Sequence, residues 1–164
     1  MIVILHGILG ASGNWRSFAA RLQRRRTDLS VVLVDLRHHG RSPHPEDASD
    51  LQACALDLVE LQANLLAQGL PHFQAIVGHS FGGKVALATL DPTLLDSFSD
   101  LSELWTLDTS PGPLSDLPED RHEVARVITA LRQIPMPLSD RKALLTLLPE
   151  QGFSLAIAKW MTTN

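Results

Sequence analysis

The chain has 164 residues, of which 45% are hydrophobic and 20% charged, a balance typical of a soluble globular domain. Its formal net charge of −4 argues against nucleic acid or an anionic membrane as the main partner, because both repel a negatively charged protein. The single cysteine, Cys54, excludes a disulfide within the chain and a cysteine-rich metal site. The N-terminal MIVILHG is neither a signal peptide nor a membrane span, so a cytoplasmic location is expected.

Short apolar runs alternate with segments of helical periodicity over the first two thirds of the chain. In chain order we expect a strand at 2–5, a helix to about 26, a strand at 31–34, a helix at about 48–68, a strand at 73–77, a helix to about 90 and a strand at 104–107. Strands that are apolar on both faces and separated by amphipathic helices predict an α/β fold. Its parallel sheet would have helices on both sides.

The sequence changes after Asp108. The segment 109–119 holds three prolines and is expected to be a loop. Helical spacing follows at 121–133, at 139–148 with Ser139 as the N-cap, and at 153–161, with no strand pattern. The sequence therefore predicts an α/β core over 1–110 and a helical cap segment over 111–164.

The stretch Gly78-His79-Ser80-Phe81-Gly82 places a serine between two glycines, after a strand and before a helix. This G-x-S-x-G pattern predicts a nucleophile elbow, which presents the serine oxygen at the carboxyl edge of the sheet. Gly78 and Gly82 would allow the tight turn and the close approach of neighbouring backbone. The alternative is an ordinary strand-to-helix turn with a surface serine.

A serine that attacks a carbonyl carbon needs two N–H donors for the oxyanion that forms. One is expected to be the Phe81 amide, and the other the Ile8 amide in the loop after the first strand. Gly7 and Gly10 would let this loop lie close to the serine. His6 is expected to hold the loop structurally.

Four segments, HGILG, DLRHHGRSPH, GHSFGGKVAL and LDTSPG, occur in an order that resembles the α/β-hydrolase superfamily. More narrowly, GHS-x-GGK with Asp-x-Ser-Pro downstream resembles the esterases of the α/β-hydrolase domain-containing protein 11 type and their bacterial acyl-esterase relatives. The resemblance implies a serine hydrolase that acts on small-molecule carboxylic esters or thioesters, without a metal or other cofactor. It implies Ser80 as the nucleophile and Asp108 as the acid.

The resemblance also implies a partial fold. Against the eight-strand sheet of the family, this chain supplies strands 3 to 6, in the order 4-3-5-6, so it resembles a fragment truncated at both ends. The strands at 31–34 and 104–107 would then be exposed sheet edges, through which the chain could self-associate.

A serine hydrolase of this kind uses a triad of nucleophile, acid and base, and the histidine that would act as the base is missing here. In the family the catalytic histidine follows a later strand that this chain does not reach, so little or no activity is expected. His122 is an alternative, because Ser80, Asp108 and His122 satisfy the chain order of the family triad. His38 and His39 lie in a loop that the resemblance implies is structural, and His79 is expected to pack beside the site.

Two other functions remain open at this point. The missing histidine favours a non-catalytic α/β module or partner-binding fragment. The pattern HG-x-x-G followed by GHS-x-GG also resembles the proton-abstracting lyases of menaquinone synthesis.

Overall fold

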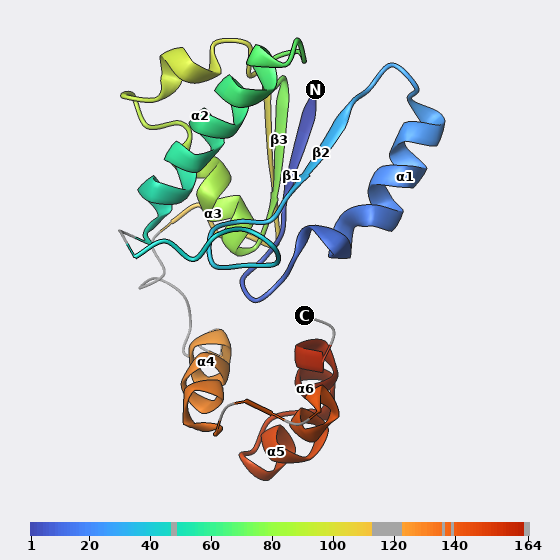
Figure 1. Cartoon of the computed structure of the whole chain (residues 1–164), viewed down its shortest axis with the longest axis vertical. Helices are drawn as coiled ribbons and strands as arrows, with labels where there is room; N and C mark the ends of the chain where they lie inside the picture. The colour runs from blue at the N-terminus through green and yellow to red at the C-terminus, as the bar shows by residue number, and fades with distance from the viewer. Residues whose placement is uncertain (47–48, 113–122, 136, 139, 163–164) are drawn as a thin grey trace. The chain divides into compact units, whose positions relative to one another are not determined.

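The computed structural model describes residues 1–46, 49–112, 123–135, 137–138 and 140–162. The chain divides into two compact units, Met1–Pro111 and Gly112–Asn164. Figure 1 shows the elements of both units.

The first unit is built on a four-stranded parallel sheet. Its strands are β1 (Ile2–Leu5), β2 (Val31–Val34), β3 (Ala75–His79) and β4 (Glu103–Leu107). They lie in the order β2-β1-β3-β4, with all three pairings parallel. The predicted α/β class and the partial sheet order are therefore confirmed.

Helices cover both faces of this sheet. They are η1 (Ser12–Trp15), α1 (Arg16–Arg25), α2 (Leu51–Ala67), α3 (Phe81–Ala88) and η2 (Leu95–Phe98). Figure 1 shows α2 and α3 on one side of the sheet and α1 on the other. The right-handed crossover of parallel strands produces this two-sided arrangement.

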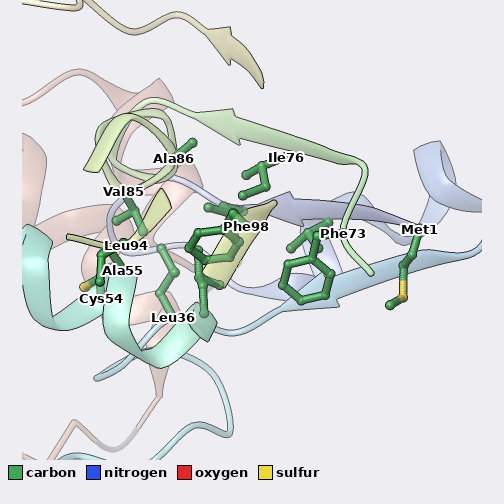
Figure 2. Packing of buried hydrophobic residues seen from close by; sticks show 13 residues of the cluster. Met1, Leu36, Cys54, Ala55, Phe73, Ile76, Val85, Ala86, Leu94 and Phe98 are labelled. Atoms are coloured by element: carbon green, nitrogen blue, oxygen red, sulfur yellow. The ribbon is translucent and has the colours of Figure 1, made fainter. Parts of the chain in front are cut away.

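The main core lies between the sheet and the pair α2 and α3 (Figure 2). Leu58 of α2, Val85 of α3, Ile76 of β3 and the loop residue Phe73 are all at most 1% exposed. Burial of a side chain of this size contributes about 1.5–3 kcal/mol. This core fixes α3 against β3, and so fixes the corner between them.

Two predicted boundaries were wrong by a few residues. The third strand begins at Ala75 rather than at Phe73, because the Phe73 amide donates to Gln62 Oε1 at 2.9 Å instead of joining the sheet. The helix expected from about residue 48 begins at Leu51, because the Asp50 carboxylate caps it by accepting from the Ala53 amide at 2.8 Å.

The two edge strands are the least buried parts of the sheet, as expected. All four residues of β2 are half-buried, and four of the five residues of β4 are exposed. On β4, Trp105 is 56% exposed and Leu107 is 37% exposed. This exposure follows from the position of β4, which among the described residues pairs with a neighbour on one side alone.

Every regular element that the structure describes in the second unit is a helix. This unit contains α4 (Glu123–Gln133), η5 (Arg141–Ala143), α5 (Leu144–Glu150) and α6 (Leu155–Thr162). The predicted N-cap Ser139 lies outside the described residues. Asp140 caps η5, with its carboxylate accepting from the Lys142 amide at 2.9 Å. None of the helices described in either unit combines the length and hydrophobicity needed to cross a membrane.

Candidate active site

Ser80 occupies the corner between β3 and α3. Its backbone has φ 50° and ψ −113°, a conformation that costs a non-glycine residue about 1–3 kcal/mol. Hydrogen bonds hold this conformation from both sides: the Ser80 amide donates to the Leu107 carbonyl at 2.9 Å, and the Ser80 carbonyl accepts from the Gly83 amide at 2.9 Å. The serine therefore lies on a strained strand-to-helix turn at the carboxyl edge of the sheet.

Glycines are required at the corner because backbone segments meet there. A Cβ on Gly78 would overlap the carbonyl group of Gly82. A Cβ on Gly82 would lie 2.7 Å from the Leu5 carbonyl oxygen, and as close to the carbonyl of His6. Both predicted elbow glycines thus permit contacts that no side chain would allow.

The loop after β1 passes directly beside the serine. A Cβ on Gly7 would lie 3.3 Å from Ser80 Cβ, and the Gly10 amide donates to the Gly7 carbonyl at 3.0 Å to close a turn. In the described part of the chain, neither the Ile8 amide nor the Phe81 amide donates a hydrogen bond to a protein acceptor. Within the described residues, the N–H groups of both predicted oxyanion donors are therefore available to a ligand.

Asp108 follows β4 at the same edge. Leu107 is paired in register with His79, so Asp108 and Ser80 follow directly after neighbouring strand positions. Asp108 has φ 51° and is exposed. Its carboxylate makes no hydrogen bond or ion pair to any residue that the structure describes.

His6 holds the loop after β1, as predicted. It is 1% exposed, its Nε2 accepts from the Leu36 amide at 3.1 Å, and its Nδ1–H donates to the Gly7 carbonyl at 2.8 Å. Burial lowers the pKa of His6 below its usual value, although the Gly7 carbonyl opposes this effect. His6 is therefore a neutral structural residue at neutral pH.

The base is not found among the described histidines. No ring in the described part of the chain hydrogen-bonds to Ser80 or Asp108. The His79 ring packs edge-on against Trp15, with ring centroids 6.1 Å apart, and His38 Nε2 bonds to Ser49 Oγ at 2.7 Å. The alternative base, His122, lies outside the described residues. Among the described residues, no three His, Cys, Asp or Glu side chains gather as ligands for a metal ion.

Comparison with known proteins assigns the chain to a family. The sequence profile of the alpha/beta hydrolase family matches residues 2–163. The chain belongs to the alpha/beta hydrolase family. Its relatives include sn-1-specific diacylglycerol lipase ABHD11 of Mus musculus, 34% identical over 83% of this chain and 40% of that protein. Esterase YbfF of Escherichia coli is 36% identical over 53% of this chain and 31% of that protein.

A solved structure supports the same assignment. It is described as a marine microorganism esterase, has a TM-score of 0.78 and is 30% identical in sequence. The match covers 99% of this chain and 58% of that structure. This alpha/beta hydrolase chain spans less than half the length of the curated relatives it matches, at 43% of the Xenopus laevis lipase and 40% of the mouse protein.

The sequence patterns gave no site role to two positions of this alpha/beta hydrolase chain, Gly83 and Thr109. A Cβ on Gly83 would collide with the side chain of Thr109, whose hydroxyl donates to the Ser80 carbonyl at 2.9 Å. The second glycine of the GG pair was the available signal for Gly83. No pattern in the sequence near Thr109 indicated its hydrogen bond to the Ser80 carbonyl.

A second missed group is the Asp35 carboxylate, which ties together two loops of this alpha/beta hydrolase. It accepts from the Ser12 amide at 2.6 Å and from the Arg41 amide at 3.1 Å, and Gly40, at φ 57°, leaves room for it. Burial alone would raise the pKa of Asp35, but the two amide donors, with help from the Ser12 hydroxyl and His6, lower it. The signal was a polar, glycine-containing segment directly after a strand.

Proposed function

We propose that this chain is a serine hydrolase of carboxylic esters or thioesters, with Ser80 as its nucleophile. The observation that carries the proposal is the strained Ser80 backbone, at φ 50°, between β3 and α3. Strain of this kind persists where the surrounding structure imposes it, and it is concentrated at functional sites. The Ser80 hydroxyl would attack the ester carbonyl carbon, release the alcohol or thiol, and leave an acyl-enzyme that water hydrolyses.

The negative charge on the carbonyl oxygen would be stabilised by the backbone. The amides of Ile8 and Phe81 are the proposed donors, because neither is used within the described part of the chain and both flank Ser80. Phe81 opens α3, so the positive end of the helix dipole adds to the field at this point. One such donor contributes about 10²–10³ to the rate in well-studied hydrolases.

Asp108 is the proposed acid, which would orient a histidine beside Ser80. Its carboxylate, which has no partner among the described residues, lies at the adjacent strand end, and both facts support this role. His122, or a histidine on another segment, would serve as the base, because no described histidine hydrogen-bonds to Ser80 or Asp108. If the base is a histidine other than His122, residues 1–164 are expected to hydrolyse esters slowly, since loss of a triad base lowers turnover by several orders of magnitude.

The aromatic group beside the serine indicates an apolar acyl subsite. The Trp15 ring contacts both Phe18, with centroids 5.5 Å apart, and His79, which directly precedes Ser80. Apolar walls with a few polar groups are typical of small-molecule sites. The names of the relatives, a diacylglycerol lipase and esterases, add support for acyl esters as the substrate class.

The test is hydrolysis of 4-nitrophenyl esters from acetate to decanoate, together with labelling by a fluorophosphonate. The reagent transfers its phosphorus to the serine oxygen and releases fluoride, so intact mass and peptide mapping locate the label. We expect slow hydrolysis and a label on Ser80, both lost in Ser80→Ala and kept in Ser99→Ala, which changes an exposed serine. A label on another residue, or equal rates in wild type and Ser80→Ala, would contradict the proposal.

A further inference from the structure

His39 links the loop after β2 to the loop after β1. Its Nε2 accepts from the Leu9 amide at 3.1 Å, and its Nδ1 lies 2.8 Å from the Arg37 carbonyl oxygen. An amide N–H can only donate and a carbonyl oxygen can only accept. The two partners therefore fix the tautomer, with the proton on Nδ1 and a lone pair on Nε2 directed at Leu9.

This contact is half of a reciprocal pair. His6, at the end of β1, accepts from the Leu36 amide in the loop after β2, while His39 accepts from Leu9 in the loop after β1. The two imidazole rings lie 5.0 Å apart between their centroids. Each loop thus supplies a histidine that holds one amide of the other loop.

Leu9 needs such a partner more than an ordinary loop residue does. It stands at the third position of the turn that the Gly10-to-Gly7 hydrogen bond closes, and its φ is 58°. Glycine or asparagine usually occupies a turn position with a positive φ, because this backbone conformation crowds the Cβ of other residues. The lone pair of His39 Nε2 favours the one orientation of the Ile8–Leu9 peptide in which the Leu9 N–H meets it.

The same ring also contacts the other side of the corner. The His39 imidazole stacks on the Phe81 ring, with centroids 6.2 Å apart and an angle of 27° between the planes. One side chain therefore touches both segments from which the uncommitted Ile8 and Phe81 amides come. No other described side chain hydrogen-bonds to the Leu9 amide.

We propose that His39 is a positioning residue for the oxyanion hole, holding the Ile8–Leu9 peptide through Nε2 and supporting Phe81 with its ring. This inference rests on the proposed function of the site. His39 does not contact the reacting atoms; it acts through the Ile8–Leu9 peptide and the Phe81 ring. Its essential feature is an acceptor at the Nε2 position, so glutamine can replace it and leucine cannot.

The first measurement is NMR of the folded chain, which needs no catalysis. Long-range ¹⁵N–¹H correlations are expected to show His39 with a protonated Nδ1 and an unprotonated Nε2. In His39→Leu the amide signals of Ile8, Leu9 and Phe81 should shift more than signals elsewhere, and in His39→Gln the Leu9 amide should stay near its wild-type position. The control His38→Asn changes the adjacent residue, at φ 63°, to one that tolerates a left-handed backbone.

The second measurement is the rate of Ser80 labelling by the fluorophosphonate, whose phosphoryl oxygen occupies the oxyanion position. We expect His39→Leu to label about tenfold or more slowly, by comparison with the loss of a single oxyanion donor. The labelling rates of His39→Gln and His38→Asn should stay within about threefold of the wild-type rate. A merely structural role would slow the leucine and glutamine variants equally, in step with their melting temperatures.

The outcomes separate the two proposals. Unlabelled wild-type Ser80 contradicts the proposed function, and the amide signals then decide on their own whether His39 holds the Ile8–Leu9 peptide. Wild-type amide signals in His39→Leu overturn the role of His39. Equal losses of labelling in the leucine and glutamine variants also overturn it, while leaving Ser80 as the nucleophile.

Discussion

The Thr109 hydroxyl donates a hydrogen bond to the Ser80 carbonyl oxygen at 2.9 Å. The same hydroxyl lies 3.1 Å from the Leu107 carbonyl, and Leu107 in turn accepts from the Ser80 amide. The peptide groups on both sides of Ser80 are thus fixed by Leu107, the last residue of β4, and by Thr109, which lies just after the strand. The strained conformation of the proposed nucleophile depends on the neighbouring strand as well as on its own glycines.

Gly83→Ala is expected to destabilise the chain by loosening this contact. The added methyl group would collide with Thr109, which must move away from the Ser80 carbonyl. Overpacking in a tight region costs about 1–3 kcal/mol, and we expect a loss of that size in urea denaturation. Gly13→Ala is the matched control, because a Cβ at Gly13 meets nothing within 4 Å. Equal stabilities for the two variants would show that the corner tolerates a side chain.

The acid stability of the chain is expected to depend on His6. Burial lowers the pKa of His6 in the folded state, whereas in the unfolded chain the imidazole titrates near its ordinary value of about 6.5. The unfolded state therefore binds more protons between these two values. The contribution of neutral His6 is present above about pH 6.5 and is lost as the pH falls through the lower, folded pKa.

The measurement is the free energy of unfolding from pH 7.5 down to pH 5, in wild type, His6→Gln and His44→Gln. One proton can contribute a slope of at most about 1.4 kcal/mol per pH unit. We expect His6→Gln to lower stability at pH 7 and to flatten the slope. His44 is exposed, so His44→Gln should keep the wild-type slope. A slope unchanged in His6→Gln would assign the acid sensitivity to other groups.

Features encoded by neighbouring residues were predictable from the sequence. The Ser80 corner follows from two glycines and a strand-to-helix change within a few positions, and the parallel sheet follows from the alternation of strands and helices. The order of the strands came from the resemblance to the α/β-hydrolase superfamily. The position of β3 was predicted less well, because Phe73 is as apolar as a strand residue but bonds to Gln62. Hydrophobicity alone cannot tell a strand residue from a buried loop residue.

Contacts between distant residues were not predictable. The Leu9 amide meets His39, thirty positions along the chain, and the Thr109 hydroxyl meets Ser80 at a separation of 29. Each depends on the register of strands that become neighbours only in the folded sheet. The sequence indicated the residues of the candidate site, therefore, but not the hydrogen bonds that hold them.

Substitution of Gln62 measures how much a buried polar residue contributes to the stability of the first unit. Gln62 is 3% exposed, its Oε1 accepts from the Phe73 amide at 2.9 Å, and its Nε2 donates to the Ser97 carbonyl. Gln62→Leu would leave both backbone groups without their partner, at about 1–3 kcal/mol for each buried group. The free energy of unfolding should fall by that order. Gln52→Leu, at an exposed position of the same helix, is the control and should have little effect.

Strand β4 provides the last prediction, which concerns self-association. It lies at the edge of the sheet, where β3 is its one neighbour in the described part of the chain, and Trp105 on it is 56% exposed. The free N–H and C=O groups of an apolar edge strand can pair with a strand of another molecule. We therefore expect concentration-dependent association in sedimentation velocity experiments.

A lysine on this edge should prevent the association, because a charge in a newly formed sheet would have to lose its water. Trp105→Lys is thus expected to sediment as a monomer at concentrations where the wild type associates. Leu56→Lys is the matched control, since Leu56 is 49% exposed on α2, away from the sheet edge. If both variants dissociate equally, general hydrophobicity rather than strand pairing drives the association. If the wild type is monomeric at every concentration tested, β4 is protected from pairing, and its exposed tryptophan needs another explanation.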